Sequence, residues 1–194
     1  MQARSWLVLP LLALAPLAAA KPAPAKVPRA TIEPRLRSYK PDPAAWRALG
    51  PGTDETLIEI AGDTKTEALV RSRAVSTLSY FPTSATRKFL ESIVTGKAAA
   101  TDATDRLLLA KAAVALGWLG GIHVPEQLAP LLDHPASDVR LDTAIGLGLT
   151  RLPPAAEVLR KRLDVENVAS VRAQISRQIQ VIEASRVPPA SAKK

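Results

Sequence analysis

Apolar residues between positions 52 and 184 recur at helical spacing, in pairs of segments separated by short turns. In the longer segment of a pair the apolar side chains share one face of a helix, as do Val171, Ile175 and Ile179. A shorter apolar-periodic segment, such as the one with Leu57 and Ile60, precedes each longer one. No stretch of the sequence alternates apolar and polar residues for long enough to indicate a strand. The pattern predicts an all-α chain built from helix, turn, helix units.

A valine–arginine pair marks the longer segments and indicates internal repeats. Arg140 and Arg172 each follow a valine, and they lie 32 residues apart. Arg71 occupies the same place in an upstream copy, and Leu109 stands in place of the arginine in a further copy. The sequence therefore predicts about four units of similar length.

Residues with a local reason to start or end a helix support these boundaries. Thr64 and Glu67 have the spacing of a capping box, which predicts reciprocal hydrogen bonds at a helix start. Gly120 and Gly121 are expected to end a long helix, because glycine readily adopts the left-handed conformation after a helix. Pro130 falls inside a predicted helix and is expected to kink it.

The segment Ser137-Asp138-Val139-Arg140, followed by Ala144 and Leu147-Gly148, carries a family resemblance. It resembles the short HEAT repeats called phycobilisome-lyase-like repeats, whose hallmark is an Asp-x-x-Val-Arg-like step into the second helix, followed by Ala and Leu-Gly. The resemblance covers about residues 52–184, and residues 42–49 are expected to add a short helix through Trp46. It implies a right-handed α-solenoid of about four HEAT-like repeats over residues 42–185, with the second helices on the concave face.

The first 20 residues have the pattern of a secretory signal peptide. Arg4 supplies a positive charge, residues 6–17 form the apolar region, and Ala18 and Ala20 form a small-residue cleavage site before Lys21. The apolar run is shorter than the about 20 residues of a membrane-spanning helix. The sequence therefore predicts a periplasmic or secreted protein that is soluble after cleavage.

The formal net charge of +8 is concentrated outside the repeats. Residues 21–41 carry +5 and residues 186–194 carry +3, whereas residues 42–185 carry −1. The first segment is predicted to be a flexible linker rich in proline and lysine, and the last a disordered basic tail. Either extension is a solubilising spacer or attracts anionic envelope polymers or lipids. A nearly neutral body with 4% aromatic residues does not favour nucleic-acid binding.

The recurring arginines allow two interpretations. Arg71, Arg140 and Arg172 could form a ladder that holds carboxylates or phosphates. A charge that recurs with the repeat is more simply part of the stacking, and we expect these arginines to be structural. Their expected acidic partners are Asp138, which belongs to the repeat motif, together with Asp142, Asp133 and Asp164.

The sequence contains few of the residues and motifs that enzymes commonly use for catalysis. The chain has no cysteine, and His123 and His134 are its two histidines, without the i, i+4 spacing of a zinc helix. Neither a glycine-rich dinucleotide motif nor a P-loop occurs in the sequence. We therefore expect no enzyme activity, no metal and no cofactor. Tyr80 and Trp118, near the ends of second helices, either pack between repeats or mark a partner-binding patch.

These observations lead to one functional hypothesis and one alternative. The first is an exported, non-enzymatic scaffold module that binds a protein or peptide partner on the concave face of the solenoid. The alternative is an electrostatic binder that uses its basic extensions to contact anionic envelope polymers or lipids. A bilin lyase or related chaperone is implied by the resemblance alone, and the predicted export counts against it.

Overall fold

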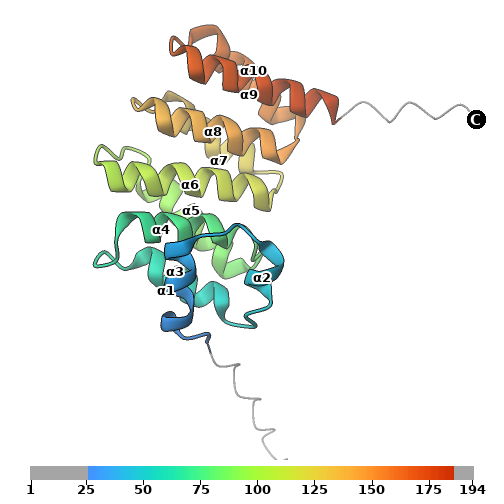
Figure 1. Cartoon of the computed structure of the whole chain (residues 1–194). Coiled ribbons are helices and arrows are strands. Elements are labelled where there is room, and N and C mark those ends of the chain that lie inside the picture. Colours follow the sequence, from blue (N-terminus) through green and yellow to red (C-terminus); the bar gives the residue numbers. More distant parts are fainter. Residues whose placement is uncertain (1–25, 186–194) are drawn as a thin grey trace, which may run out of the picture.

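The computed structural model describes residues 26–185 and contains only helices within that range (Figure 1). The predicted cleavage site at Ala18, Ala20 and Lys21 and the predicted tail 186–194 lie outside the described residues. The all-α prediction is confirmed for the described part of the chain. The helices are α1 (Arg29–Ser38), α2 (Pro43–Arg47), α3 (Thr53–Gly62), α4 (Ala68–Leu78), α5 (Ser84–Gly96), α6 (Ala103–Leu119), α7 (Val124–Leu128), the 3-10 helix η1 (Ala129–Asp133), α8 (Ser137–Thr150), α9 (Pro153–Val165) and α10 (Ala169–Ala184).

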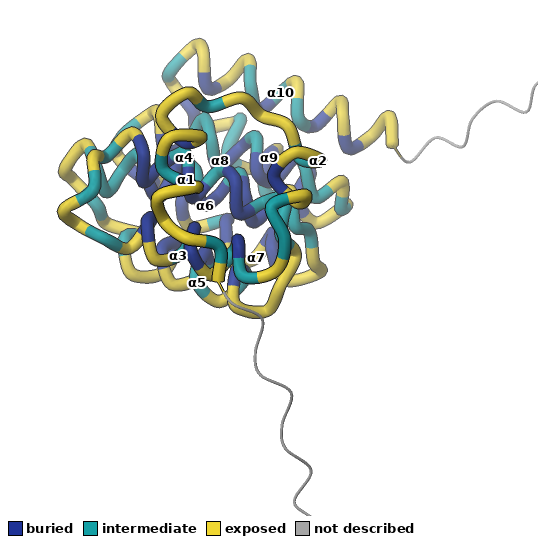
Figure 2. The backbone as a smooth tube through the Cα atoms, turned by 60° about the horizontal axis from the view of Figure 1, so that its bottom comes forward, coloured by how far each residue is buried: buried dark blue, intermediate teal, exposed yellow. Residues whose placement is uncertain are grey.

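The helices from α3 onward form two layers. Helix α4 packs on α6, α6 on α8 and α8 on α10, so these four second helices lie side by side as one layer (Figure 1). Each of them also packs on the helix that precedes it, since α3 contacts α4, α5 contacts α6, η1 contacts α8 and α9 contacts α10. The buried residues lie between the two layers, and the exposed residues lie on the outside (Figure 2).

The burial pattern shows which positions of the second helices are equivalent. Residues 139–148 of α8 alternate between buried and partly exposed positions in nearly the same order as residues 108–117 of α6. Residues 70–78 of α4 follow the same order. Arg71, Leu109 and Arg140 are therefore equivalent, as the sequence pattern indicated.

Glycines allow α6 and α8 to approach closely. A Cβ atom added at Gly146 would lie 2.4 Å from the carbonyl oxygen of Ala113, and one added at Gly117 would lie 2.0 Å from that of Gly146. Any side chain at these positions would collide with the backbone of the neighbouring helix, which has little room to move. These two glycines thus set the spacing of the two central helices.

The predicted helix boundaries are partly correct. Gly120 caps α6 with a φ of 66°, as expected for glycine. At Pro130 the α-helix gives way to the 3-10 helix η1, a stronger disruption than a kink. The predicted capping box is wrong, because Glu67 makes no side-chain cap before α4. Asp63 organises this turn instead by accepting hydrogen bonds from the backbone N–H of Lys65 (2.9 Å) and the Thr66 hydroxyl (3.0 Å).

Helix α1 corrects the prediction that residues 21–41 are a flexible linker. Residues 29–38 are helical, and Ile32 and Leu36 are fully buried against the core. These two side chains are four residues apart, so they form one apolar face, which packs on α3 and α4. The abundant charges and Pro34 obscured this face, since only two apolar positions carry it.

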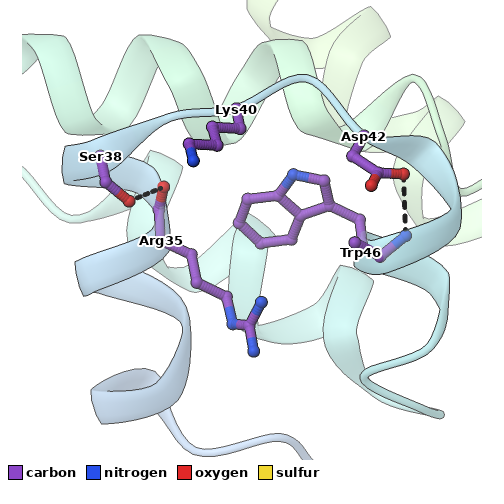
Figure 3. A pocket seen from close by; sticks show the side chains of 6 residues that line it. Arg35, Ser38, Lys40, Asp42 and Trp46 are labelled. Atoms are coloured by element: carbon purple, nitrogen blue, oxygen red, sulfur yellow. Dashed lines mark hydrogen bonds between the residues drawn. The ribbon is translucent and has the colours of Figure 1, made fainter.

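The predicted short helix through Trp46 is present as α2. The carboxylate of Asp42 accepts hydrogen bonds from the N–H groups of Ala44 and Ala45, both at 3.0 Å, and so caps the helix. The Trp46 indole is buried, and Arg35 and Lys40 lie around it in a small hollow (Figure 3). This tryptophan joins the N-terminal segment to the core.

Ion pairs hold the N-terminal segment to the first two repeat helices. Lys26 lies 2.5 Å from Glu59, a carboxylate of α3. Arg29 contacts Asp63 at 2.8 Å. Arg37 lies 2.7 Å from Glu67. Three cations of the basic segment 21–41 therefore contact carboxylates of the molecule itself.

Candidate functional site

A groove of about 300 Å³ lies between the connection from α1 to α2 and the second helices α4 and α6. Tyr80 and Trp118, which the sequence singled out near the ends of second helices, both line it. The opposite wall comes from the α1–α2 connection, where the sequence predicted a linker. The complete lining is Tyr39, Pro41, Pro43, Ser76, Ser79, Tyr80, Lys111, Val114, Ala115 and Trp118.

Two arginines hold the walls of this groove in place. Arg73 of α4 donates hydrogen bonds to the carbonyl oxygens of Leu36 (2.9 Å) and Arg37 (2.8 Å) at the end of α1. Its guanidinium also lies 5.6 Å from the centre of the Tyr39 ring, a cation–π distance. Arg47 of α2 donates to the carbonyl oxygen of Tyr80 at 3.1 Å. The end of α1 is thereby fixed to α4, and the end of α2 is fixed to the segment that follows α4.

The chemistry of the groove suits binding rather than proton transfer. Its described lining contains neither a carboxylate nor an imidazole. Burial raises the pKa of the Tyr80 phenol, and the neighbouring Tyr39 adds to this, so the phenol is neutral at physiological pH. At the edge of the groove the Lys111 ammonium lies 2.7 Å from a carboxylate oxygen of Asp142 on α8. The site therefore offers aromatic and proline surfaces with hydroxyl groups between them.

The groove is one end of a longer row of partly exposed side chains. Tyr80 and Trp118 occupy equivalent positions, and the corresponding residues of α8 and α10 are Leu149, which is half-buried, and Val181. Trp118 is 58% exposed and Val181 is 41% exposed, so the row contains two of the exposed large apolar side chains of the described residues. We call Tyr80, Trp118, Leu149 and Val181 the C-terminal row, because they lie near the C-terminal ends of the second helices.

The recurring arginines contact the ends of the preceding helices. Arg71 donates to the carbonyl oxygen of Ala61 in α3 at 3.0 Å. Arg140 donates to the carbonyl oxygens of His134 and Pro135, both at 2.9 Å. Arg172 donates to the carbonyl oxygens of Leu163 (2.7 Å) and Glu166 (2.8 Å). The C-terminal carbonyls of a helix need such donors, so these contacts agree with a structural role.

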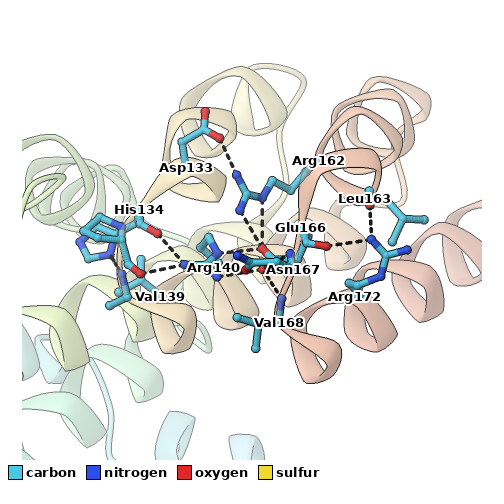
Figure 4. A network of polar contacts seen from close by, with 12 residues as sticks. Asp133, His134, Val139, Arg140, Arg162, Leu163, Glu166, Asn167, Val168 and Arg172 are labelled. Carbon is cyan, nitrogen blue, oxygen red and sulfur yellow. Dashed lines mark hydrogen bonds and ion pairs between the residues drawn. The ribbon is translucent and has the colours of Figure 1, made fainter.

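Arg140 has an acidic partner other than those predicted. Its Nε and one terminal nitrogen each donate to Glu166 at 2.8 Å (Figure 4). Three of the four predicted candidates lie against other cations, since Asp142 pairs with Lys111, Asp133 with Arg162 and Asp138 with Arg106. Glu166 follows α9 in the next repeat, so this pair joins two units.

Glu166 is the centre of the network in Figure 4. Arg162 donates to its carboxylate at 2.9 Å, and the backbone N–H groups of Asn167 (3.1 Å) and Val168 (2.9 Å) do the same. The hydrogen bond from Arg140 is the main reason why the pKa of this buried carboxyl falls to about 2. Sequence reasoning missed Glu166, because no spacing rule links it to Arg140.

Arg106 replaces the arginine that the second copy lacks at Leu109. It lies one turn earlier in α6 and donates to the carbonyl oxygen of Thr101 at 2.7 Å, in the loop before the helix. Its Nε also lies 3.7 Å from a carboxylate oxygen of Asp138. Asp138 itself accepts a hydrogen bond from the N–H of Val139 at 2.8 Å. A search for Val-Arg pairs could not find Arg106, because it follows an aspartate.

His134 is buried and has a structural environment. Its Nδ1 accepts a hydrogen bond from the N–H of Ala136 at 3.0 Å, so Nε2 carries the proton and donates to the carbonyl oxygen of Ala100 at 3.0 Å. Residues 26–185 contain no group of three His, Asp or Glu residues placed to hold a metal ion.

No protein-family model matches the chain, and a search of curated proteins finds no match either. Within residues 26–185, no helix is both long enough and apolar enough to cross a membrane.

Proposed function

We propose that this protein is an exported, non-catalytic interaction module that binds a protein or peptide on the face formed by its second helices. The observation that carries the proposal is the groove that joins Tyr39, Tyr80 and Trp118, together with the partly exposed side chains at the equivalent positions of α8 and α10. Aromatic side chains on a fixed frame supply contact area with little loss of conformational entropy, and they dominate many interfaces.

The architecture that we propose is a HEAT-like right-handed α-solenoid of about four repeats. It is supported by the contact of each second helix with the next and by the recurrence of the Arg-to-carbonyl hydrogen bonds. Such repeats stack by nearest-neighbour contacts and present an extended surface to partners. Export is supported by the composition of residues 1–20, and detection of Lys21 as the mature N-terminus would test it.

Site-specific photo-crosslinking tests the proposed face in the full chain. A photoreactive phenylalanine in place of Trp118 is expected to crosslink to a discrete species in the extracytoplasmic fraction. The same group in place of Ile122 serves as the matched control, because Ile122 is 76% exposed but lies outside the groove. Equal products from both positions would contradict the proposal.

Binding of the purified species then measures the contribution of the groove. Trp118→Ala is expected to weaken binding about tenfold or more, whereas Ile122→Ala leaves it unchanged. Binding that survives about 0.5 M salt would agree with this apolar surface. A steep loss of binding with salt, without any effect of Trp118→Ala, would support the electrostatic alternative instead.

A further inference from the structure

The C-terminal row ends beside the point where the described chain ends. Val181 lies one turn before Ser185, which follows α10, and its side chain is exposed. Figure 1 shows that α10 and α6 end at the same side of the layer. We propose that residues 186–194 bind along the C-terminal row of their own molecule and cover Trp118. This inference rests on the proposed function of the groove.

The length of the segment matches the distance to be covered. Packed helices lie about 8–10 Å apart, so Trp118 on α6 is about 20 Å from Val181 on α10, with α8 between them. Nine residues in an extended polyproline conformation, at about 3.1 Å each, span about 28 Å. The other end of the described chain lies away from the row, because Lys26 is paired with Glu59 of α3 in the other layer.

The composition of the segment also fits the row. Its first apolar residues are Val187, Pro188 and Pro189. They would cover Val181 and then Leu149 of α8, and the two prolines bring no N–H group that would need a partner. Proline-rich segments are extended before they bind, so aromatic surfaces recognise them at low entropic cost.

The end of the segment reaches the exposed tryptophan. Lys193 would lie about 25 Å along the segment, a few ångströms beyond Trp118, and a lysine ammonium binds favourably to an indole face. Tethering gives the segment an effective concentration on the order of millimolar, so a contact with a dissociation constant of about 1 mM is about half occupied. An external partner must then displace the segment from the groove.

Acrylamide quenching of tryptophan fluorescence in the full chain tests this contact. Trp6→Phe removes the tryptophan of the first 20 residues, and Trp46 is buried, so quenching reports mainly on Trp118. Replacing residues 187–189 by glycine and both terminal lysines by serine is expected to raise the quenching constant about twofold. The matched control replaces Pro22 and Pro24 by glycine and leaves the constant unchanged.

Three outcomes of the quenching experiment decide whether residues 186–194 cover Trp118. Quenching that is the same with and without the substitutions at 187–194 overturns the proposal. Protection that increases with protein concentration also overturns it, because the segment then comes from another molecule. Protection that is independent of concentration supports it, even if the crosslinking experiment finds no partner and the proposed function fails.

Discussion

At the scale of single residues, the network around Glu166 joins adjacent units through charge. A fully buried carboxylate is unfavourable unless donors surround it, and Arg140, Arg162 and two backbone N–H groups supply them. The partners that the sequence suggested for Arg140 were nearby aspartates, two of which pair with Lys111 and Arg162 instead. The fold, rather than sequence distance, selects the partner.

The lowered pKa of Glu166 predicts acid sensitivity. Because the pKa is about 2 in the folded protein and 4.5 in the unfolded chain, the stabilisation is complete above pH 4.5 and is lost as the pH falls toward 2. The shift corresponds to about 3 kcal/mol. Urea unfolding between pH 2 and pH 7 should show this loss in the original chain.

The variant Glu166→Gln is compared with the original chain in the same urea titrations. It should lower stability at pH 7 by about 3 kcal/mol, because two largely buried guanidinium groups lose their counter-charge, and it should flatten the pH dependence below 4.5. Glu157→Gln, at an exposed position of α9, should change neither quantity. An unchanged acid limb in the Glu166 variant would contradict this role.

Arg151 carries a strained backbone that predicts a stabilising substitution. It follows α8 with a φ of 54°, a conformation that favours glycine, whereas Gly120 occupies the corresponding place after α6. Arg151→Gly should raise the unfolding free energy by about 1 kcal/mol in urea titrations. Arg151→Ala retains the Cβ atom and should give no such gain.

At the scale of helices, the close contact between α6 and α8 predicts that a side chain at Gly146 destabilises the protein. Gly146→Ala places a methyl group against the backbone of Ala113 and should destabilise the protein by about 1–3 kcal/mol. Gly96→Ala is the matched control, since its Cβ would meet no atom within 4 Å. Thermal unfolding of both variants measures the difference, and equal melting temperatures would refute it.

Whether α1 is part of the folded core can also be tested, because the sequence alone assigned residues 21–41 to a linker. Leu36→Ala should cost about 2–5 kcal/mol by leaving a cavity between α1, α3 and α4. Arg35→Ala, on the exposed side of the same helix, should have little effect. A linker would tolerate both changes equally, so the difference between the two unfolding midpoints distinguishes the interpretations.

The sequence predicted the repeated helices well, because each has several apolar positions in phase. Helix α1 has only Ile32 and Leu36, too few to stand out among its charges. The sequence predicted one wall of the groove and missed the other. Tyr80 and Trp118 occupy equivalent repeat positions, which the sequence could indicate, but Tyr39 reaches them only because Arg73 fixes the end of α1 on α4. That contact depends on tertiary structure.

At the scale of the whole molecule, the row of helices predicts uneven stability. Helices α6 and α8 have neighbours on both sides within their layer, whereas among the described helices α10 packs mainly on α8 and α9. Stability in such an array is a sum of nearest-neighbour terms, so its ends open first. Hydrogen exchange should be slowest in α6 and α8 and faster in α10, and uniform exchange would contradict this.

The arginine contacts also predict that the loops before the second helices and the loops after them differ in how well they tolerate insertions. The loops before α6, α8 and α10 are each held by an arginine of the helix that follows, through Thr101, Pro135 and Glu166. A residue added there would displace the guanidinium from its carbonyl. The loops after the second helices border the C-terminal row instead. Arginines of other helices hold the chain after α4 and at the end of α6, through Tyr80 and Leu119. The loop after α8 can therefore vary in length beside the proposed binding surface while the packing of the second helices stays the same.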